Sequence, residues 1–401
     1  MLTSKTILVG VTGGIAAYKT AQLVSDLVKL HADVHCIMTE NATEFIAPLT
    51  FETLTGNKCI VDTFDRNFQW NVQHVSLAQK ADLFVVAPAT ANIMAKLAFG
   101  LADDMLSTTF LACSCRKLIA PAMNTGMYLN PVTQRNLQLL RQAGMRIIEP
   151  ASGRLACGDV GVGKLAGLED IMDAVLYELA YEKDLKGLHI LVTAGPTCEA
   201  VDPVRYITNH SSGKMGYEVA KAARMRGAEV VLVSGPTVLA RPHGVEMVDV
   251  VSAQEMFEAV TSRLQSCDIV VKAAAVGDFR PVHVSEDKIK KAQGARVIEL
   301  AENPDILSYI GHCKSDSQVV CGFSMETRDL IENSSRKLRQ KNADMIVANN
   351  LTAEGAGFKG DTNLVTLLTG EETEELELMS KTQVAHRILD RLLFLYQKKN
   401  Q

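Results

Sequence analysis

The stretch His189–Gly216, which reads HILVTAGPTCEAVDPVRYITNHSSGKMG, decides the fold of this chain. Its apolar run Ile190–Val192 ends in a glycine-proline turn, and a polar loop then leads to SSGK at 211–214, where an amphipathic run begins. A strand, a glycine-bearing loop and a helix N-terminus together suit a phosphate group, because free backbone N–H groups point at the ligand. The same pattern occurs at 7–30, so we expect two nucleotide-binding domains in tandem.

The length and composition are those of a multidomain globular protein. The chain has 401 residues, of which 47% are hydrophobic and 22% charged, and ~150 residues per domain predicts two or three domains. A net charge of −5 gives no general attraction to nucleic acid or membranes. Nine scattered cysteines indicate reduced thiols, and there is neither a signal-peptide pattern nor an apolar run of ~18 residues. We therefore expect a cytoplasmic protein without nucleic-acid or membrane partners.

The first half alternates buried strands with helical runs, which predicts a doubly wound parallel sheet. The expected strands are Ile7–Val11, Asp33–Met38, Leu83–Ala87 and Lys117–Ala120. Gly13 and Gly14 follow the first strand, and Thr39 follows the second with no acidic residue placed to hold a ribose, which favours a mononucleotide. The fold class expected for the whole chain is α/β, with two tandem Rossmann-like domains, each a mostly parallel sheet with helices on both faces.

Three isolated residues of the first half could do chemistry. His74 precedes a helical run, although a lone histidine is more often structural or solvated. Asn124 follows a strand end and could orient a carboxylate, or it could only form a turn. Cys157 lies in the glycine-rich stretch 151–167, which predicts a loop that covers a site. A thiol on such a loop can transfer a proton, and an inert buried thiol is an equally good interpretation.

Five features of the first half carry a resemblance to a known family: GGIAAYK (Gly13–Lys19), His74, PATAN (Pro88–Asn92), PAMNTGMY (Pro121–Tyr128) and ACGDVGVGK (Ala156–Lys164). With them this half resembles the flavin-dependent phosphopantothenoylcysteine decarboxylases. The resemblance implies FMN as cofactor, His74 as catalytic base, Asn124 and Met123 near the substrate carboxylate, and Cys157 as proton donor. It further implies FMN contacts from Gly13, Gly14, Ile15, Thr39, Pro88, Ala89, Thr90 and Asn92, and substrate contacts from Met123 and Met127.

The second half also ends its strands in polar residues. Asp278 follows a predicted strand and could hold a metal or contact a base, or it could only form a turn. The basic run 288–291 suits either a mobile arm that closes on a triphosphate or a solvated surface, and Lys337 and Lys341 share a helix face for either reason. Nearer the C-terminus, Phe358–Leu368 predicts an edge hairpin and 397–400 a frayed tail.

Six motifs give the second half its own resemblance: TAGPT (Thr193–Thr197), DPVRYITNHSSGKMG (Asp202–Gly216), SGP (Ser234–Pro236), AAAVGDFRP (Ala273–Pro281), KIKK (Lys288–Lys291) and NPDIL (Asn303–Leu307). It is similar to the phosphopantothenate–cysteine ligases. The resemblance implies CTP and Mg²⁺, with Asn209 on the acyl carbonyl, Lys288 on the phosphate of an acyl-cytidylate and Asp278 as a metal ligand. The implied CTP contacts are Ser211, Ser212, Gly213, Lys214, Ala273, Ala274, Ala275, Asp278, Lys288, Asn303, Pro304, Asp305, Ile306, Phe323, Lys337 and Lys341.

Together the halves resemble the bacterial bifunctional proteins of coenzyme A biosynthesis. We therefore expect a decarboxylase domain at 1–185 and a ligase domain at 186–401, which act on 4′-phosphopantothenate, cysteine and CTP. The resemblance also implies homo-oligomers, with decarboxylase trimers that assemble further and ligase dimers. A flavin-binding regulatory protein is the main alternative, and the retained His74, Asn124 and Cys157 speak against it. A nicotinamide-dependent oxidoreductase is disfavoured because no G-x-G-x-x-G follows the first strand of either half.

Overall fold

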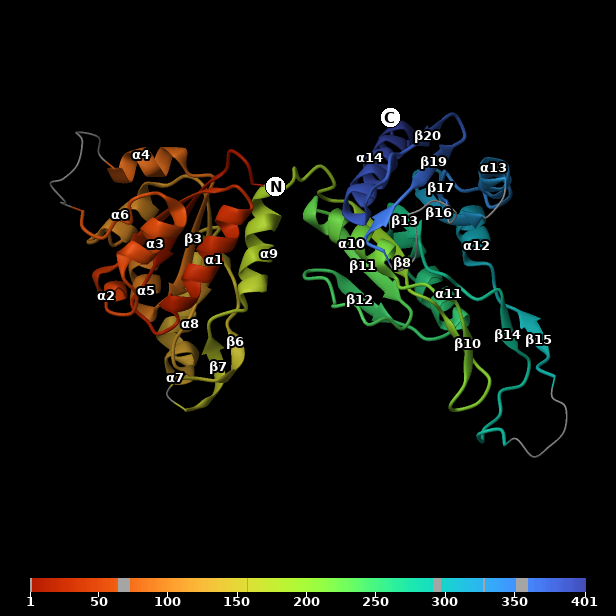
Figure 1. Cartoon of the computed structure of the whole chain (residues 1–401), viewed down its shortest axis with the longest axis horizontal. Helices are drawn as coiled ribbons and strands as arrows, with labels where there is room; N and C mark the ends of the chain where they lie inside the picture. Colours follow the sequence, from red (N-terminus) through yellow and green to blue (C-terminus); the bar gives the residue numbers. More distant parts are fainter. Residues whose placement is uncertain (1, 64–72, 157, 291–296, 327–328, 351–359) are drawn as a thin grey trace. The chain divides into compact units, whose positions relative to one another are not determined.

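The computed structural model describes residues 2–63, 73–156, 158–290, 297–326, 329–350 and 360–401. The chain divides into two compact units, Met1–Glu182 and Lys183–Gln401 (Figure 1). Each unit is a sheet with helices on both faces, as the sequence predicts. Among the helices described, none combines the length and the apolarity needed to cross a membrane.

The first unit is built on five parallel strands. They are β1 (Thr6–Val11), β2 (Asp33–Met38), β3 (Leu83–Ala89), β4 (Arg116–Pro121) and β5 (Arg146–Ile147). Their order in the sheet is β2-β1-β3-β4-β5, and every pairing is parallel. The connections from β1 to β2 and from β3 to β4 run in opposite directions across the sheet, so the strand order changes direction between β1 and β3. In such folds a crevice for ligands opens at this point, beyond the carboxyl ends of the strands.

Helices cover both faces of this sheet. They are α1 (Ala17–Lys29), α2 (Glu40–Thr43), α3 (Pro48–Thr55), α4 (Gln73–Lys80), α5 (Ala91–Phe99), α6 (Met105–Ala112), α7 (Thr125–Leu129), α8 (Pro131–Gln142) and α9 (Leu168–Leu179). Because successive side chains of a strand point to opposite faces, Val9 joins the core under α1, α3 and α9, whereas Leu8 joins the core under α4, α5, α6 and α8. The central strands are therefore buried on both sides, which explains their continuous apolar sequences.

The described part of the glycine-rich stretch 151–167 contains two antiparallel strands that pair as a β-hairpin. Its strands are β6 (Ala151–Arg154) and β7 (Val160–Lys164), so the predicted irregular loop is wrong for this part of the chain. The N–H of Met123 donates to the carbonyl of Gly163 over 2.9 Å, which holds the hairpin against the end of β4. Gly163 has φ +130°, and a Cβ there would lie 2.4 Å from the Met123 carbonyl oxygen. Only glycine fits this close approach.

The second unit has an eight-stranded sheet. Its strands are β8 (His189–Ala194), β11 (Glu229–Ser234), β12 (Glu246–Asp249), β13 (Ile269–Lys272), β16 (Val319–Glu326), β17 (Met345–Asn350), β19 (Val365–Thr369) and β20 (Thr373–Glu375). The order is β12-β11-β8-β13-β16-β17-β19-β20. The pairings from β12 to β17 are parallel, and β19 pairs antiparallel with both β17 and β20. The six parallel strands thus follow the 3-2-1-4-5-6 order of nucleotide-binding folds, with the crevice between β8 and β13.

The remaining elements complete the second unit. Three short strand pairs are β9 (Cys198–Ala200) with β10 (Tyr206–Thr208), β14 (Phe279–Pro281) with β15 (Leu300–Glu302), and β18 (Thr362–Asn363) with β21 (Met379–Ser380). The helices are α10 (Lys214–Met225), α11 (Ala253–Thr261), α12 (Ile306–Cys313), α13 (Leu330–Gln340) and α14 (Lys381–Lys399), with a 3₁₀ turn at Leu264–Ser266. Helices α10 and α14 cover one face of the sheet, and α11, α12 and α13 cover the other.

Two expectations for the C-terminal part are wrong. The predicted hairpin over 358–368 is replaced, in its described part from residue 360, by pairing of β18 with β21 and of β19 with both β17 and β20. The predicted frayed tail is helical, because α14 continues to Lys399. The Lys399 ammonium donates to the carbonyl of Gln318 over 2.8 Å and pairs with Asp344 over 2.7 Å. These contacts tie the helix end to the sheet.

Candidate active sites

A cavity of about 470 Å³ opens at the carboxyl ends of β1, β3 and β4 in the first unit. Its volume lies within the range of small-molecule sites. Eight residues predicted to bind FMN or substrate line it, namely Gly13, Gly14, Ile15, Pro88, Thr90, Met123, Asn124 and Met127. The cavity therefore lies at the strand-order reversal, where the fold places a ligand.

The turn that follows β1 is held by hydrogen bonds, and it places its backbone at the wall of the cavity. The hydroxyl of Thr12 donates to the Pro88 carbonyl over 2.6 Å and accepts from the N–H of Thr90 over 3.1 Å, which ties the β1 turn to the end of β3. A Cβ on Gly13 would lie 2.5 Å from the Cβ of Asn41, so this position requires glycine. A glycine turn that leads into a helix suits an anion, because the N–H groups at a helix N-terminus point toward it.

The described residues fit a flavin mononucleotide at this cavity. The hydroxyl oxygen of Thr39 is buried and has no hydrogen-bond partner within the described part of the chain, although Thr39 is not among the residues that line the cavity. At the cavity itself, Ile15 and Met127 are 59% and 50% exposed, so apolar surface is available for a flat ring. Among the other predicted FMN residues, Ala89 ends β3 and Asn92 lies in the first turn of α5.

The three residues expected to do chemistry have different positions. Asn124 caps α7, with its carbonyl oxygen accepting from the N–H of Gly126 over 2.8 Å and its amide donating to the Asp159 carboxylate over 3.1 Å. His74 lies on α4 and is not among the described residues that line the cavity. Cys157 lies outside the described residues, although its neighbour Ala156 lines the cavity.

Three cations that the sequence motifs did not indicate also line this cavity. They are Lys19 on α1, Arg154 at the end of β6 and Lys164 at the end of β7. Cations around an apolar cavity suit a ligand that carries phosphate. Lys19 lies inside the quoted GGIAAYK motif, so its position after the glycine turn was a usable signal. Arg154 and Lys164 could not be identified from the sequence, because only the β6–β7 hairpin brings them to the cavity.

In the second unit, two glycines bring the start of α10 against the end of β8. Gly195 has φ +75° and Gly213 has φ +78°, and a Cβ on Gly213 would lie 3.2 Å from the Gly195 backbone. Gly213 is the N-cap of α10, and its N–H donates to the Ser211 hydroxyl over 3.3 Å. Lys214 pairs with Asp361 over 2.7 Å. The predicted SSGK residues thus present a helix N-terminus at the strand ends.

The polar residues predicted to bind nucleotide or acyl group meet around the ends of β8 and β13. The amide of Asn209 donates to the carbonyl of Ala275 over 3.1 Å, and the N–H of Ala274 donates to the Thr193 hydroxyl over 3.1 Å. The N–H of Asn303 donates to the Asp278 carbonyl over 2.8 Å. These bonds bring together Asn209, the alanine run 273–275, Asp278 and Asn303. The sequence indicated each of these residues as a separate candidate and did not show that they are neighbours.

The predicted residues of α12 and α13 are also in contact. The Asp305 carboxylate caps α12 through the N–H of Ser308 over 2.8 Å and accepts from the Lys341 ammonium over 2.7 Å. Burial opposes its ionisation, but the bonds from Lys341 and Ser308 outweigh burial and lower the pKa of Asp305. Lys337 donates to the carbonyl of Phe323 over 2.8 Å. Pro304 and Ile306 flank Asp305, and Ile306 is buried.

Lys272, the last residue of β13, is a further charged residue of this region that the sequence motifs did not indicate. By alternation it shares a sheet face with Val270, which packs under α11, α12 and α13. Its ammonium donates to the Ala274 carbonyl over 3.1 Å. Burial and the Lys337 charge lower the pKa of Lys272, and Asp305 and Asp278 partly oppose them, so that the pKa is about 8. A lysine that ends a buried strand was the signal that could have identified it.

The proposed metal position rests on one exposed carboxylate. Asp278 is exposed, and the described residues contain no group of three or more histidine, cysteine, aspartate and glutamate side chains that could hold a metal. Mg²⁺ commonly takes one or two protein carboxylates and completes its shell with water and substrate phosphates. A Mg²⁺ at Asp278 would therefore depend on a bound triphosphate. Lys288 is exposed nearby in sequence, and Lys291 lies outside the described residues.

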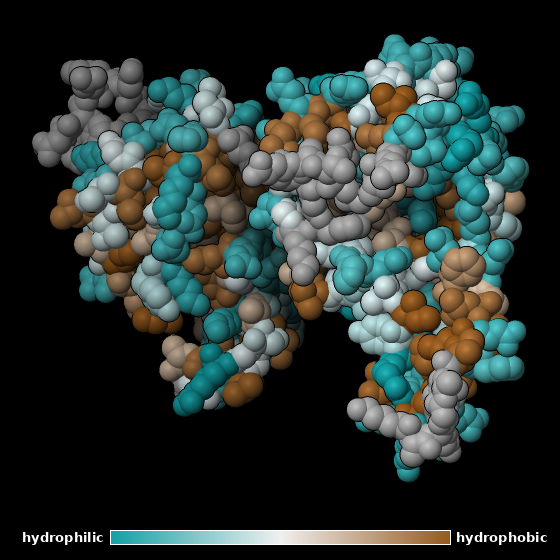
Figure 2. All heavy atoms as spheres, turned by 45° about the vertical axis from the view of Figure 1, so that its right-hand side comes forward, coloured by the Kyte–Doolittle hydropathy of each residue, from teal (hydrophilic) through white to brown (hydrophobic). Residues whose placement is uncertain are grey.

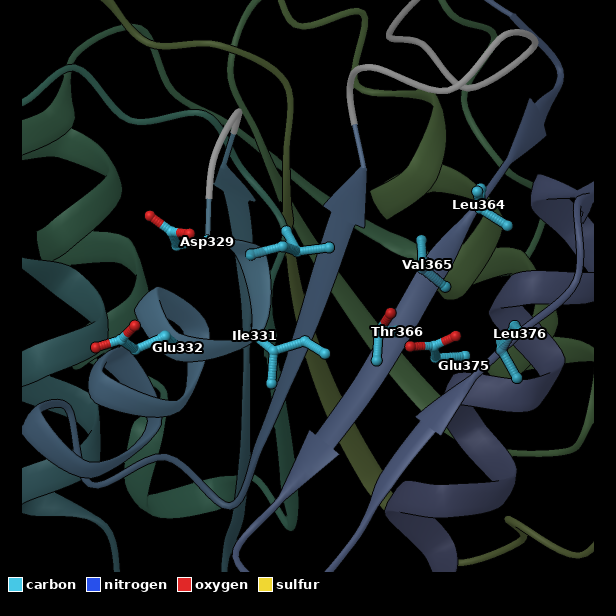
Figure 3. Close-up of a pocket in the computed structure, with 9 residues that line it drawn as sticks. Asp329, Ile331, Glu332, Leu364, Val365, Thr366, Glu375 and Leu376 are labelled. Carbon is cyan, nitrogen blue, oxygen red and sulfur yellow. The ribbon is translucent and has the colours of Figure 1, made fainter.

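A cavity of about 410 Å³ in the second unit differs in charge from the cavity of the first unit. Figure 3 shows Asp329, Ile331 and Glu332 of the α13 region on one side, with Thr366 and Glu375 on the strands β19 and β20 beside them. Its described lining carries three carboxylates and no lysine or arginine. Such a lining repels phosphate, so this cavity does not suit the nucleotide.

Family models match each unit. Flavoprotein matches residues 1–180, and the model described as DNA/pantothenate metabolism flavoprotein C-terminal domain matches residues 185–395. The coenzyme A biosynthesis bifunctional protein CoaBC of Bacillus subtilis (strain 168) is 46% identical over 399 residues, which are 98% of this chain and 98% of that protein. The chain belongs to the family of bifunctional coenzyme A biosynthesis proteins.

Other members of this family match at similar length. The CoaBC proteins of Haemophilus influenzae and Escherichia coli (strain K12) are 42% and 41% identical, and the matches cover 99% and 100% of this chain and 99% of each relative. A crystal structure of the C-terminal domain of a CoaBC protein is 44% identical, covers 54% of this chain and all of that chain, and has a TM-score of 0.47. A structure of an FMN-dependent cysteine decarboxylase is 33% identical over 45% of this chain and all of its own, with a TM-score of 0.40.

Proposed function

We propose that this chain catalyses two consecutive steps of coenzyme A biosynthesis. The second unit couples 4′-phosphopantothenate to cysteine with CTP, and the first unit decarboxylates the product to 4′-phosphopantetheine. The observation that carries the proposal is the full-length identity of 41–46% to bifunctional proteins of this pathway. The two separate sites, each at the carboxyl edge of its own sheet, support it.

The ligase step needs activation of a carboxylate, which is a poor electrophile. The substrate carboxylate attacks the α-phosphorus of CTP, pyrophosphate leaves, and an acyl-cytidylate forms. The amine of cysteine then attacks the acyl carbon and CMP leaves. Lys288 neutralises the phosphate and Asn209 orients the acyl carbonyl, while Mg²⁺ near Asp278 would offset the charge of the triphosphate. The contact of Asn209 with the alanine run 273–275 supports this assignment.

The decarboxylase step needs an electron sink, because CO₂ leaves a carbon that cannot hold the electron pair alone. When bound, FMN supplies the reversible two-electron oxidation of the substrate that creates this sink. Asn124 and Met123 hold the carboxylate, His74 acts as the base, and Cys157 returns a proton to the product. The anchoring of Asn124 to the β6–β7 hairpin supports its positioning role. Gly13, Gly14, Thr39, Pro88 and Thr90 would hold the cofactor.

We further propose that the ligase unit forms a dimer. Figure 2 shows hydrophobic side chains gathered around the strand pair β14–β15, at the lower right of the view. Phe279 of β14 and Leu300 of β15 are 50% and 46% exposed, and Val284, which follows β14 in the chain, is 55% exposed. Exposed apolar residues concentrated around one strand pair favour association. The trimer of the decarboxylase unit stays a prediction from resemblance.

The test is a product analysis by mass spectrometry. The purified full chain, reconstituted with FMN, is mixed with 4′-phosphopantothenate, cysteine, Mg²⁺ and CTP. We expect CMP, pyrophosphate and 4′-phosphopantetheine together. Accumulation of phosphopantothenoylcysteine would mean an active ligase with an inactive first unit, and that result would contradict the decarboxylase assignment. A yellow protein that forms no CMP would favour the regulatory flavoprotein instead.

A further inference from the structure

Ile289 lies between Lys288 and Lys290, and both of its backbone polar groups are held by side chains. Its N–H donates to the Asp202 carboxylate over 3.2 Å, and its carbonyl accepts from the Arg205 guanidinium over 2.7 Å. Both partners come from the turn between β9 and β10, more than eighty residues earlier in the chain. The lysine segment is therefore attached to the start of the unit at this point.

Asp202 is the centre of this attachment. One carboxylate oxygen accepts from the N–H groups of Val204 and Arg205 over 2.9 and 2.8 Å, and the other accepts from the Arg205 Nε over 2.9 Å in addition to Ile289. Its side chain is 0% exposed. Burial opposes ionisation, but the bonds from Arg205 and from the backbone N–H groups outweigh it and hold the pKa of Asp202 well below its usual range. The carboxylate is charged at neutral pH and binds its donors strongly.

A second contact holds the same segment a few residues earlier. The N–H of Ser285 donates to the carbonyl of Val201 over 3.1 Å, and the N–H of Val201 donates to the carbonyl of Arg205 over 2.9 Å. The Asp202 turn thus supports two points of the segment that leads to Lys288. The same turn leads through β10 to Asn209, whose amide contacts the end of β13.

We propose that Asp202 and Arg205 are positioning residues that hold the backbone of Ile289 and thereby place Lys288 for the ligation step. The role of Lys288 itself rests on the function proposed above. The β9–β10 hairpin then positions both residues proposed to contact the acyl-cytidylate. Asn209 directly follows β10, and the turn of the hairpin binds the backbone next to Lys288. Reactive groups must be held within a fraction of an ångström for full rate, so a loose clamp lowers the rate without removing the binding residues.

The experiment uses the full chain with Arg205→Gln, Arg205→Lys and Asp202→Asn. Asparagine keeps a carbonyl oxygen for the Val204 and Arg205 N–H groups, but it loses the charge that binds the guanidinium. For Arg205→Gln and Asp202→Asn we expect the kcat of CTP-dependent ligation to fall at least about tenfold, with the KM for CTP changed by less than about threefold. Arg205→Lys keeps the charge and should restore part of the loss, since lysine cannot bond both partners with one planar group.

The second readout is trypsin cleavage after Lys288, followed by mass spectrometry of the same proteins. A clamped Ile289 peptide resists the protease, so we expect faster cleavage in Arg205→Gln and Asp202→Asn than in the parent. The matched control is Arg241→Gln, which removes an exposed ion pair with Asp249 in the same unit. It should change neither ligation nor cleavage, and all variants should decarboxylate supplied phosphopantothenoylcysteine at the parent rate.

The outcomes separate the clamp from the proposed function. Slow ligation with unchanged cleavage after Lys288 would overturn the clamp, because the two residues would then act directly on substrate. Parent-like ligation in both Arg205→Gln and Asp202→Asn would overturn it as well. Normal ligation by Lys288→Gln would instead contradict the function proposed for Lys288, whereas faster cleavage in the clamp variants would still show that the contact holds the segment.

Discussion

At the scale of single residues, Lys272 connects a local environment to a pH dependence. Its pKa is lowered to about 8, so the ammonium is charged at neutral pH and loses its proton as the pH rises through that value. It interacts electrostatically with Lys337 and Asp305, which are both proposed to bind the nucleotide. The charge would attract phosphate only below its pKa.

We therefore expect CTP binding to weaken above pH 8, by up to about tenfold per pH unit. Lys272→Arg should keep tight binding at higher pH, because a guanidinium stays charged there. Equilibrium dialysis of CTP with the full chain and Mg²⁺ between about pH 7 and about pH 9 measures the effect. Lys314→Arg is the control, since Lys314 is a partly buried lysine paired with Asp344 instead. Identical profiles for the parent and Lys272→Arg would contradict the prediction.

Lys288 gives the second prediction at this scale. Lys288→Gln removes the charge proposed to neutralise the acyl-cytidylate phosphate, so we expect loss of CTP-dependent coupling by at least about a hundredfold. Decarboxylation of supplied phosphopantothenoylcysteine should continue at the parent rate, because that site lies in the other unit. Separate assays of CMP release and CO₂ release measure the two steps. Simultaneous loss of both activities would argue against independent sites.

At the scale of elements, the β6–β7 hairpin closes one side of the first cavity. Gly163→Ala would place a methyl group 2.4 Å from the Met123 carbonyl oxygen at φ +130°, so the hairpin must move away from β4. We expect the variant to lose about 1–3 kcal/mol of stability and to bind less FMN per chain. Flavin absorbance after reconstitution and thermal unfolding are the measurements. Gly370→Ala has no heavy atom within 4 Å of the new methyl group and should match the parent. Parent-like flavin content in Gly163→Ala would show that the hairpin does not shape the site.

At the scale of the whole molecule, each unit has cores of its own, so we expect the two units to unfold as separate cooperative transitions. Arg226 tests this expectation. Its side chain is 6% exposed and pairs with Asp184 and Asp390, which anchors α14 in the second unit.

Arg226→Met should lower the stability of the second unit by about 1–3 kcal/mol, less than for a fully buried pair because both carboxylates are partly exposed. The transition of the first unit should stay unchanged in differential scanning calorimetry. The matched exposed pair Arg387–Glu374, removed by Arg387→Met, should have a much smaller effect. A joint shift of both transitions in Arg226→Met would show that the units unfold together.

Much of the architecture could be predicted from local sequence. Apolar runs of strand length and the glycine turns after them indicated both sheets, and β2 begins and ends where the sequence predicts. The reason is that a strand buried on both faces needs a continuous apolar sequence, and a close approach of two backbone segments needs glycine. The glycine-rich hairpin and the helical C-terminus were missed because their structure depends on what they pack against.

The sequence by itself determined that this protein is a tandem of nucleotide-binding folds and where along the chain its ligand-binding turns lie. Tertiary structure alone decided which side chains meet at those turns. Burial within the folded unit and the charge of Lys337, 65 positions away, lower the pKa of Lys272, and Arg205 reaches a carbonyl 84 positions away. Such contacts depend on how distant segments pack, and no local pattern of residue types encodes that packing.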